Sequence, residues 1–201
     1  MMGDAATNTE VTYDAYLALE RSTNWKHEWI DGVAYAMAGG TPTHSRLSAQ
    51  MIVELARLLG ERPCAIHTSD LKVRPEGLRF ATYPDVAVVC GEAQTHADDP
   101  NAVTNPVVLV EVLSDSTERW DRTGKFRRYR KIAALRDYVL VSQNERCIEV
   151  YSRGPDGTWT LREAGEGESV PLSALEASLD VDRVFRGVTL TPEVPRERAI
   201  G

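Results

Sequence analysis

Two carboxylates stand in segments that otherwise predict buried β-strands. Asp85 follows Pro84 and precedes the apolar run 86–89, and Glu111 interrupts the apolar run 107–113. A buried ionised carboxylate is costly unless it is paired, hydrogen-bonded or bound to a metal. Two such groups on neighbouring strands repel each other, and a divalent cation with a preference for oxygen ligands, Mg²⁺ or Mn²⁺, relieves that repulsion. The alternative is that each carboxylate caps a loop or pairs with an arginine.

Lys125 follows Glu111 after a short loop and is one of only four lysines in the chain. Helical spacing places it on one face with Asp121 and Tyr129, at the edge of an apolar stripe. From that edge its ammonium group can reach toward Glu111 and orient a water or stabilise charge on a phosphate. The alternative is a solvated lysine on a basic helix.

The elements around these residues are predicted by capping and turn signals. Thr12 can cap a helix that extends to Glu20, and Asp31-Gly32 predicts a hairpin between strands 26–30 and 33–37. Thr41 then offers an N-cap for a helix that ends at Leu59, before Gly60. The buried stripe of this second helix is predicted to comprise Leu47, Met51, Leu55 and Leu58.

The remaining elements alternate between strands and helices, which predicts an α/β or α+β fold with a mixed central sheet flanked by helices. The expected segments are strands 65–68, 71–73, 85–90 and 107–113, a polar loop 91–105, a basic helix 121–134, strands 138–142 and 147–152, a hairpin around 156–157, and a short helix 181–185. The chain length predicts one domain over residues 11–190 with loose ends at 1–10 and 191–201.

The charge of the chain is unevenly distributed. The formal net charge is −7, which taken alone disfavours a nucleic-acid partner. Residues 118–136 contain eight basic and two acidic side chains, so this segment carries 8 − 2 = +6 and the rest of the chain −7 − 6 = −13. This segregation supports a local surface that faces phosphates.

Cysteine usage and the N-terminal sequence indicate the compartment. Cys64, Cys90 and Cys147 are odd in number and far apart, which disfavours a disulfide framework and predicts reduced thiols, buried at Cys90 and Cys147. The first ten residues lack a signal-peptide pattern, and no apolar run approaches the roughly 18 residues of a membrane span. We therefore expect a cytoplasmic protein without a membrane partner.

The sequence resembles a known family at five short motifs. They are, in chain order, His27-Glu28-Trp29-Ile30-Asp31-Gly32, Met37-Ala38-Gly39 to His44, Tyr83-Pro84-Asp85-Val86, Val110-Glu111-Val112-Leu113-Ser114 and Asp121-Arg122-x-x-Lys125-Phe126-x-x-Tyr129. Their order and spacing are similar to those of the Uma-two family of restriction endonucleases, which belongs to the PD-(D/E)XK nuclease superfamily. The resemblance covers residues 13–188 and implies a restriction-endonuclease-like core, to which the N-terminal helix and hairpin are added.

The resemblance also implies roles for individual residues. Asp85, Glu111 and the Val112 carbonyl would hold one or two Mg²⁺ or Mn²⁺ ions for phosphodiester hydrolysis. Leu113 occupies the lysine slot of (D/E)XK, and the family supplies the missing lysine from the next helix, here Lys125.

Two further residues are candidates beside this core. Glu28 is a further metal ligand or water-positioning group, or else a strand-end glutamate. His44 is a phosphate-binding group near a helix N-terminus, or else only a helix cap. Tyr129 is expected to pack, Asp115 to face water, and Asp70 and Lys72 are weaker candidates.

These observations predict a Mg²⁺-dependent endonuclease that acts on DNA, with a homodimer as the expected assembly for duplex cleavage. Leu113 motivates the alternative, a nuclease-fold protein with little or no activity that binds nucleic acid or another partner. A third hypothesis is a ribonuclease or other phosphodiesterase using the same site.

Overall fold

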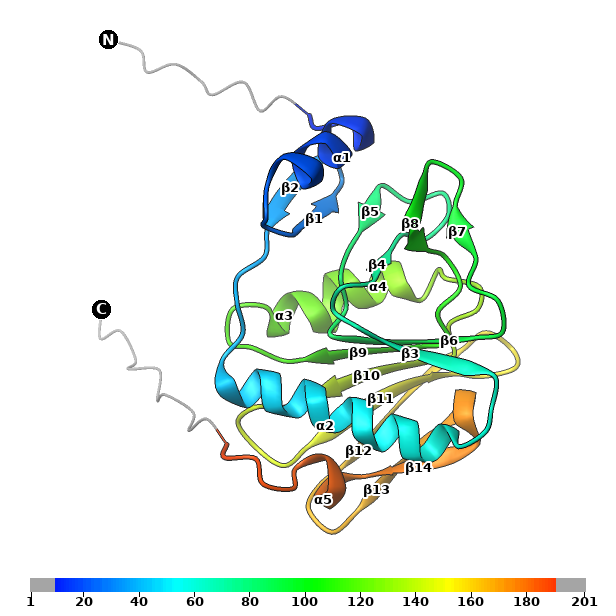
Figure 1. Ribbon diagram of the computed structural model, residues 1–201. Coiled ribbons are helices and arrows are strands. Elements are labelled where there is room, and N and C mark those ends of the chain that lie inside the picture. The colour runs from blue at the N-terminus through cyan, green and yellow to red at the C-terminus, as the bar shows by residue number, and fades with distance from the viewer. Residues whose placement is uncertain (1–9, 191–201) are drawn as a thin grey trace, which may run out of the picture.

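A six-stranded mixed sheet forms the centre of the protein, which we describe from a computed structural model over residues 10–190 (Figure 1). Its strands in spatial order are β12 (Trp159–Ala164), β11 (Ile148–Arg153), β10 (Asp137–Val141), β9 (Val108–Val112), β6 (Val86–Cys90) and β3 (Cys64–Thr68). β9 and β10 run parallel, and the other neighbours are antiparallel. The predicted mixed sheet is confirmed. The expectation of one domain over 11–190 stays a prediction, and the expected loose ends lie outside the described residues, apart from Glu10.

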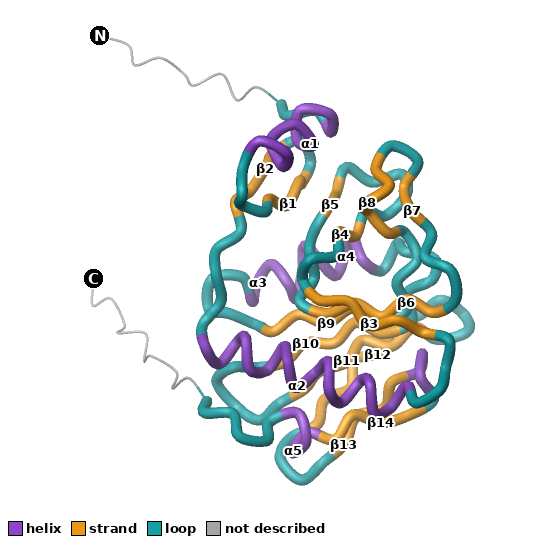
Figure 2. The backbone as a smooth tube through the Cα atoms, viewed as in Figure 1, coloured by secondary structure: helices purple, strands orange, loops and turns teal. Residues whose placement is uncertain are grey.

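Both faces of the sheet are covered, which explains the near-continuous apolar sequences of β6 and β9 (Figure 2). One face packs against α2 (Pro42–Leu59), α5 (Val181–Val184) and the ribbon of β13 (Ser169–Leu172) and β14 (Ala177–Asp180), with the short η2 (Ser173–Leu175) between its strands. The other face packs against the helical segment α3 (Glu118–Trp120), η1 (Asp121–Lys125) and α4 (Phe126–Tyr129). No helix in residues 10–190 is both long and apolar enough to cross a membrane.

The N-terminal helix and hairpin form a separate small layer at one end of the sheet (Figure 1). α1 (Tyr13–Ser22) is capped by Thr12 as predicted, and β1 (His27–Ile30) pairs with β2 (Val33–Ala36) and with β5 (Phe80–Ala81). Asp31 and Gly32 both have positive φ, 50° and 88°, as a two-residue hairpin turn requires. Tyr13 and Tyr16 pack with Trp29, so α1 holds the hairpin through an aromatic cluster.

The second helix, α2, has the bounds that its sequence predicts. The Thr41 side chain accepts a hydrogen bond from the His44 backbone N–H, and Pro42 is the first helical residue. Gly60 ends the helix with a φ of 54°. Three of the four predicted stripe residues are fully buried, and the fourth, Leu58, is partly buried.

The predicted basic helix over 121–134 is wrong in its bounds and in its geometry. The helical segment begins at Glu118, contains a π-helical turn at Asp121–Lys125 and ends at Tyr129. The Trp120 ring lies across Gly124, where an added Cβ would come within 1.8 Å of the ring. Only glycine fits under the indole in this wider turn, and such turns are frequent at functional sites.

The predicted polar loop over 91–105 also proves to contain strands. β7 (Thr95–His96) pairs with β8 (Asp99–Val103), and β8 runs parallel to β4 (Lys72–Val73). Ala102 and Val103 are buried by this pairing. Pro100 and the acidic residues before it are typical of turns, so the local sequence hides the strand.

The expectation of three reduced cysteines is wrong for two of them. Cys64 and Cys90 form a disulfide, because antiparallel β3 and β6 place these residues directly opposite each other. The sequence could not show this, since the two residues are 26 positions apart and become neighbours only through strand pairing. Cys147 is free, and burial raises the pKa of its thiol to about 12.

We expect the double variant Cys64→Ser/Cys90→Ser to lower the free energy of unfolding by about 3 kcal/mol, because the bond closes a loop in the unfolded chain. Denaturant unfolding of the wild type, with and without reductant, measures the effect. Cys147→Ser is the matched control and should respond to reductant as the wild type does. Three titratable thiols in the denatured, unreduced protein would contradict the disulfide.

Candidate active site

The two carboxylates singled out in the sequence meet at adjacent strand ends. The pairing of β6 with β9 sets Val86 opposite Val110, so the next positions bring Asp85 opposite Glu111. Both side chains point to the face that carries α4, because residues alternate between the faces of a strand. Asp85 Oδ2 accepts a hydrogen bond of 2.7 Å from the Val112 backbone N–H, which fixes the first carboxylate against the strand of the second.

Lys125 lies at the centre of a group of carboxylates. Its Nζ is 3.1 Å from Glu111 Oε1, 3.1 Å from Glu28 Oε1 and 3.3 Å from Asp121 Oδ1. The side chain is buried, with 6% of the residue exposed. Burial works against its charge, but the facing carboxylates outweigh burial and hold the pKa of Lys125 well above its ordinary value. The predicted reach from helix to strand is therefore present, and the lysine is an ammonium ion.

Glu111 is buried, with 4% of the residue exposed. Burial raises the pKa of Glu111 well above its ordinary value, and the nearby Lys125 opposes the rise. The Tyr129 hydroxyl donates a hydrogen bond of 2.9 Å to Glu111 Oε1. Tyr129 was expected only to pack; it does pack, and it also orients this carboxylate.

Glu28 reaches the same centre from the hairpin. The Thr82 hydroxyl donates a hydrogen bond to Glu28 Oε1, the oxygen that also faces Lys125. The strand that carries Glu28 is fixed from outside by α1, whose Tyr16 hydroxyl donates to the His27 carbonyl at 2.8 Å. The structure thus brings Glu28 together with Lys125, while its role as a metal ligand or water-positioning group stays a prediction.

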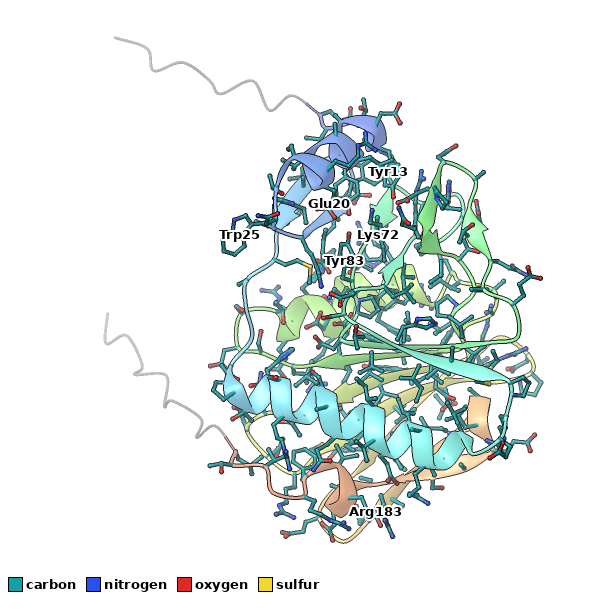
Figure 3. The ribbon with its side chains drawn as sticks, viewed as in Figure 1. Tyr13, Glu20, Trp25, Lys72, Tyr83 and Arg183 are labelled. Carbon is teal, nitrogen blue, oxygen red and sulfur yellow. A yellow bond between two sulfur atoms is a disulfide. The ribbon has the colours of Figure 1, made fainter. Side chains whose placement is uncertain are left out.

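Glu20 of α1 ties together the two segments that precede the carboxylates (Figure 3). Its Oε1 accepts a hydrogen bond of 2.8 Å from the His27 backbone N–H, and its Oε2 accepts one from the Tyr83 hydroxyl. His27 precedes Glu28 by one residue, and Tyr83 precedes Asp85 by two. α1 therefore acts as a brace for the site.

His44 contacts Asp85. Its Nε2 is 3.1 Å from Asp85 Oδ2, and this hydrogen-bonded carboxylate raises the pKa of His44. Next to it, the Thr41 hydroxyl donates to Gln143 Oε1 and Gln143 Nε2 donates to the Leu113 carbonyl, each at 2.6 Å. Gln143 therefore couples the start of α2 to the end of β9, a role that no sequence signal indicated.

Asp121 is a site residue that the sequence hypothesis did not include. It is 2% exposed, and its Oδ1 is a buried atom without a hydrogen bond in residues 10–190, close to Lys125 but outside hydrogen-bond geometry. Burial raises the pKa of Asp121, and Lys125 opposes the rise. The sequence signal for its role was its position four residues before Lys125, which places both side chains on the same helix face.

The two weaker candidates lie elsewhere. Lys72 is buried against Asp99 beside α1, where its Nζ is 3.0 Å from Asp99 Oδ2 (Figure 3), and Asp70 is an exposed partner of Lys26. Neither lines the cleft at the carboxylates. Asp115 is exposed, as expected, and lies on the rim of that cleft.

The carboxylates open into a cleft of about 1020 Å³ between the hairpin, the start of α2 and the helical segment 117–128. The site residues that line this cleft are Glu28, Thr41, His44, Asp85, Glu111, Asp121, Lys125 and Gln143, whereas Tyr129 and Glu20 support them from outside it. The cleft is therefore open to a ligand much larger than a single phosphate group.

The donor chemistry of the cleft fits a magnesium ion. The carboxylates supply hard oxygen atoms, and the unpartnered Asp121 Oδ1 is one oxygen left without a hydrogen bond. Within residues 10–190, no group of three His, Cys, Asp or Glu side chains has the geometry to bind a metal ion without further ligands. Mg²⁺ is usually held by only one or two carboxylates and keeps several waters, so Asp85 and Glu111 suffice as a candidate pair.

The mixed sheet with carboxylates at the paired ends of β6 and β9, and a lysine on the next helix, defines a nuclease-like protein of the restriction-endonuclease-like fold. The family model described as "Uma2: Putative restriction endonuclease" matches residues 13–184, and the chain belongs to this family. The family resemblance of the motifs is thus confirmed.

The chain is similar to two curated cyanobacterial proteins and to one solved structure. It is 36% identical over 175 residues to the uncharacterized protein slr1290 of Synechocystis sp., covering 87% of this chain and 91% of that protein. It is 33% identical over 172 residues to the uncharacterized protein sll1609 of the same organism, covering 85% and 97%. A crystal structure described as a "putative nuclease belonging to DUF820" from Anabaena variabilis matches with a TM-score of 0.69 and 17% identity over 87% of this chain and 97% of that one. This last likeness shows the fold.

We expect the pairing of His44 with Asp85 to make stability depend on pH. The pKa of His44 is higher in the folded protein than in the unfolded chain. The pairing therefore contributes fully to the free energy of unfolding below the unfolded-state pKa of about 6.5, and this contribution is lost as the pH rises through the folded-state pKa. The difference in unfolding free energy between wild type and His44→Gln should therefore be largest below about pH 6.5 and shrink as the pH rises above that value. Urea unfolding at a series of pH values measures it, and a difference independent of pH would contradict the pairing.

Proposed function

We propose that the protein is a metal-dependent endonuclease that hydrolyses phosphodiester bonds in DNA. The observation that carries this proposal is the placement of Lys125 within 3.1–3.3 Å of Glu28, Glu111 and Asp121, in the same open cleft that Asp85 lines. Membership of a family described as restriction endonucleases supports the same class of reaction.

The charge of the site supports a requirement for a divalent cation. The four carboxylates Asp85, Glu111, Glu28 and Asp121 share the cleft with Lys125, so the cleft without a bound cation disfavours a phosphodiester. A bound Mg²⁺ would lower the pKa of a water and polarise the phosphoryl oxygen. Asp85 and Glu111 are the proposed ligands, because they meet at the strand ends and face the cleft.

The other side chains have complementary proposed roles. Lys125 keeps its proton and would donate a hydrogen bond to the phosphate as negative charge builds up in the transition state. Glu28 would orient the attacking water, and Tyr129 holds Glu111 in place. His44 holds Asp85 and lies where it can meet a phosphate at the start of α2.

The second candidate function is a nuclease-fold module that binds nucleic acid without cutting it. The observation in its favour is that Leu113, in the lysine slot of the motif, is buried and carries no charge. A homodimer is the proposed assembly for cleavage of both strands of a duplex.

We expect Lys125→Met and Glu111→Gln each to lower the rate of Mg²⁺-dependent cleavage by at least about 100-fold, because the first removes the proposed hydrogen-bond donor to the phosphate and the second a proposed metal ligand. The controls are Arg162→Met and Glu163→Gln, which remove one positive and one negative charge at exposed positions of β12. Cleavage of plasmid and linear DNA with Mg²⁺ or Mn²⁺ is the assay, and circular dichroism checks the fold.

The outcomes of this assay separate the candidate functions. Cleavage that survives in Glu111→Gln would show a contaminating nuclease and exclude this site. No cleavage by the wild type, with intact binding of DNA, would favour the binding module.

The outer side of the basic segment is a second place to test the proposal. Arg127, Arg130, Lys131 and Arg136 are exposed, whereas the ion pairs of this segment involve Arg122, Lys125 and Arg128. We expect the triple variant Arg127→Ala/Arg130→Ala/Lys131→Ala to weaken DNA binding equally for all sequences. The slope of the logarithm of the binding constant against the logarithm of the salt concentration should become less steep by about three. Fluorescence anisotropy across a salt series measures the slope, and an unchanged slope would contradict this surface.

A further inference from the structure

One wall of the cleft is apolar, and it belongs to the hairpin. Glu28, Ile30, Val33, Tyr35 and Met37 all line the cleft. Residues 28 and 30 alternate along β1, and 33 and 35 alternate along β2, so their side chains share one face of the hairpin. Of the five, only Glu28 is charged. Apolar side chains do not contribute to the binding of a phosphate, so this wall indicates that the ligand also has an apolar part.

Tyr35 is the exposed aromatic of this wall. Tyr35 pairs directly with Glu28 in the hairpin register, and side chains of such pairs leave the sheet about 5 Å apart on the same face. Tyr35 is 52% exposed and is one of four exposed large hydrophobic residues within residues 10–190. The ring therefore stands next to the carboxylates, open to the cleft and within the reach of one nucleotide.

We propose that this hairpin face binds an unpaired nucleobase next to the scissile phosphate, stacked on Tyr35, and that the substrate class is nucleic acid with unpaired nucleotides at the cut. In an intact duplex both faces of a base are covered by its neighbours, so the ring would find no partner there. A base in a single strand, or one turned out of the stack, has a free π-face, and aromatic stacking accepts any base. This inference rests on the proposed function of the same cleft.

The position of the wall relative to the charged centre supports this occupant. The carboxylates and Lys125 form one side of the cleft and would take the phosphate, while Ile30, Val33 and Met37 continue the hairpin face beside Tyr35. A nucleotide has the same division, an anionic group joined to a flat apolar ring. β2 is the outer strand of its sheet, so no further strand lies beside Tyr35 on that side, and the residue is 52% exposed.

The chain offers a matched control for Tyr35. Trp25 is 68% exposed, belongs to the segment that leads into β1 and lies at the outer edge of the molecule (Figure 3). It is not part of the cleft wall. Trp25→Ala therefore removes an exposed aromatic from the same region without touching the proposed stacking face.

The test compares the wild type, Tyr35→Ala, Tyr35→Phe and Trp25→Ala at fixed salt with Ca²⁺. Fluorescence anisotropy gives their affinities for a single-stranded oligonucleotide, its perfect duplex and the duplex with one unpaired base. We expect Tyr35→Ala to weaken binding of the two probes with unpaired bases by about 5- to 150-fold, with duplex binding unchanged. Tyr35→Phe and Trp25→Ala should stay within about twofold of the wild type, because the first keeps the ring and the second lies off the wall.

Several results would overturn the inference. They are unchanged single-strand affinity in Tyr35→Ala, an equal loss on the perfect duplex, or a loss in Tyr35→Phe as large as in Tyr35→Ala. A shift from dimer to monomer on sedimentation of Tyr35→Ala would assign the ring to a second copy of the chain. A wild type that binds none of the probes would overturn the proposed function as well, whereas failure of Tyr35→Ala alone leaves it standing.

Discussion

The ion group around Lys125 is the constraint on which the rest of the structure depends. Buried charges of either sign are unfavourable alone, and here one ammonium group compensates carboxylates from three elements: Glu28 of β1, Glu111 of β9 and Asp121 of η1. The hairpin, the central sheet and the helical segment must therefore meet at one point. The π-helical turn brings both Asp121 and Lys125 to that point, and Gly124 under Trp120 makes the turn possible. The brace of α1 serves the same end, because it fixes the residues before Glu28 and Asp85.

The same ion group bears on how the proposed endonuclease would act on a polyanion while the chain carries a net charge of −7. Under that proposal, the carboxylates would disfavour a phosphate in the absence of a cation, and a bound cation would take the same oxygens as its ligands. The exposed basic side chains Arg127, Arg130, Lys131 and Arg136 lie in and just after the helical segment, outside the ion group around Lys125. The proposed attraction of the polyanion and the proposed chemistry would therefore use different side chains, which a net charge does not describe.

The sequence predicts the parts of the fold that local physics controls. The cap at Thr41, the glycine at position 60 and the Asp31-Gly32 turn act within a few residues, and their elements have nearly the predicted bounds. Asp85 and Glu111 stood out because a charge in an apolar strand needs compensation. What the sequence could not show depends on partners far along the chain: β8 exists because β4 lies beside it, and Cys64 meets Cys90 only across two strands. The π-helical turn was not predicted because glycine is locally only a weak helix former, and the sequence does not show that the Trp120 ring packs directly against Gly124.

The two walls of the cleft bear on the expected assembly. A single site cuts one strand, so an enzyme for intact duplexes needs a second copy placed across the helix axis. A site that selects an unpaired nucleotide works on one strand and needs no second copy for its chemistry. The exposed Tyr35 ring beside Glu28 therefore weakens the mechanistic reason for a homodimer. If the hairpin wall is a base-binding surface, the substrate is recognised through its departure from the duplex and not through the order of its bases, because stacking accepts any base.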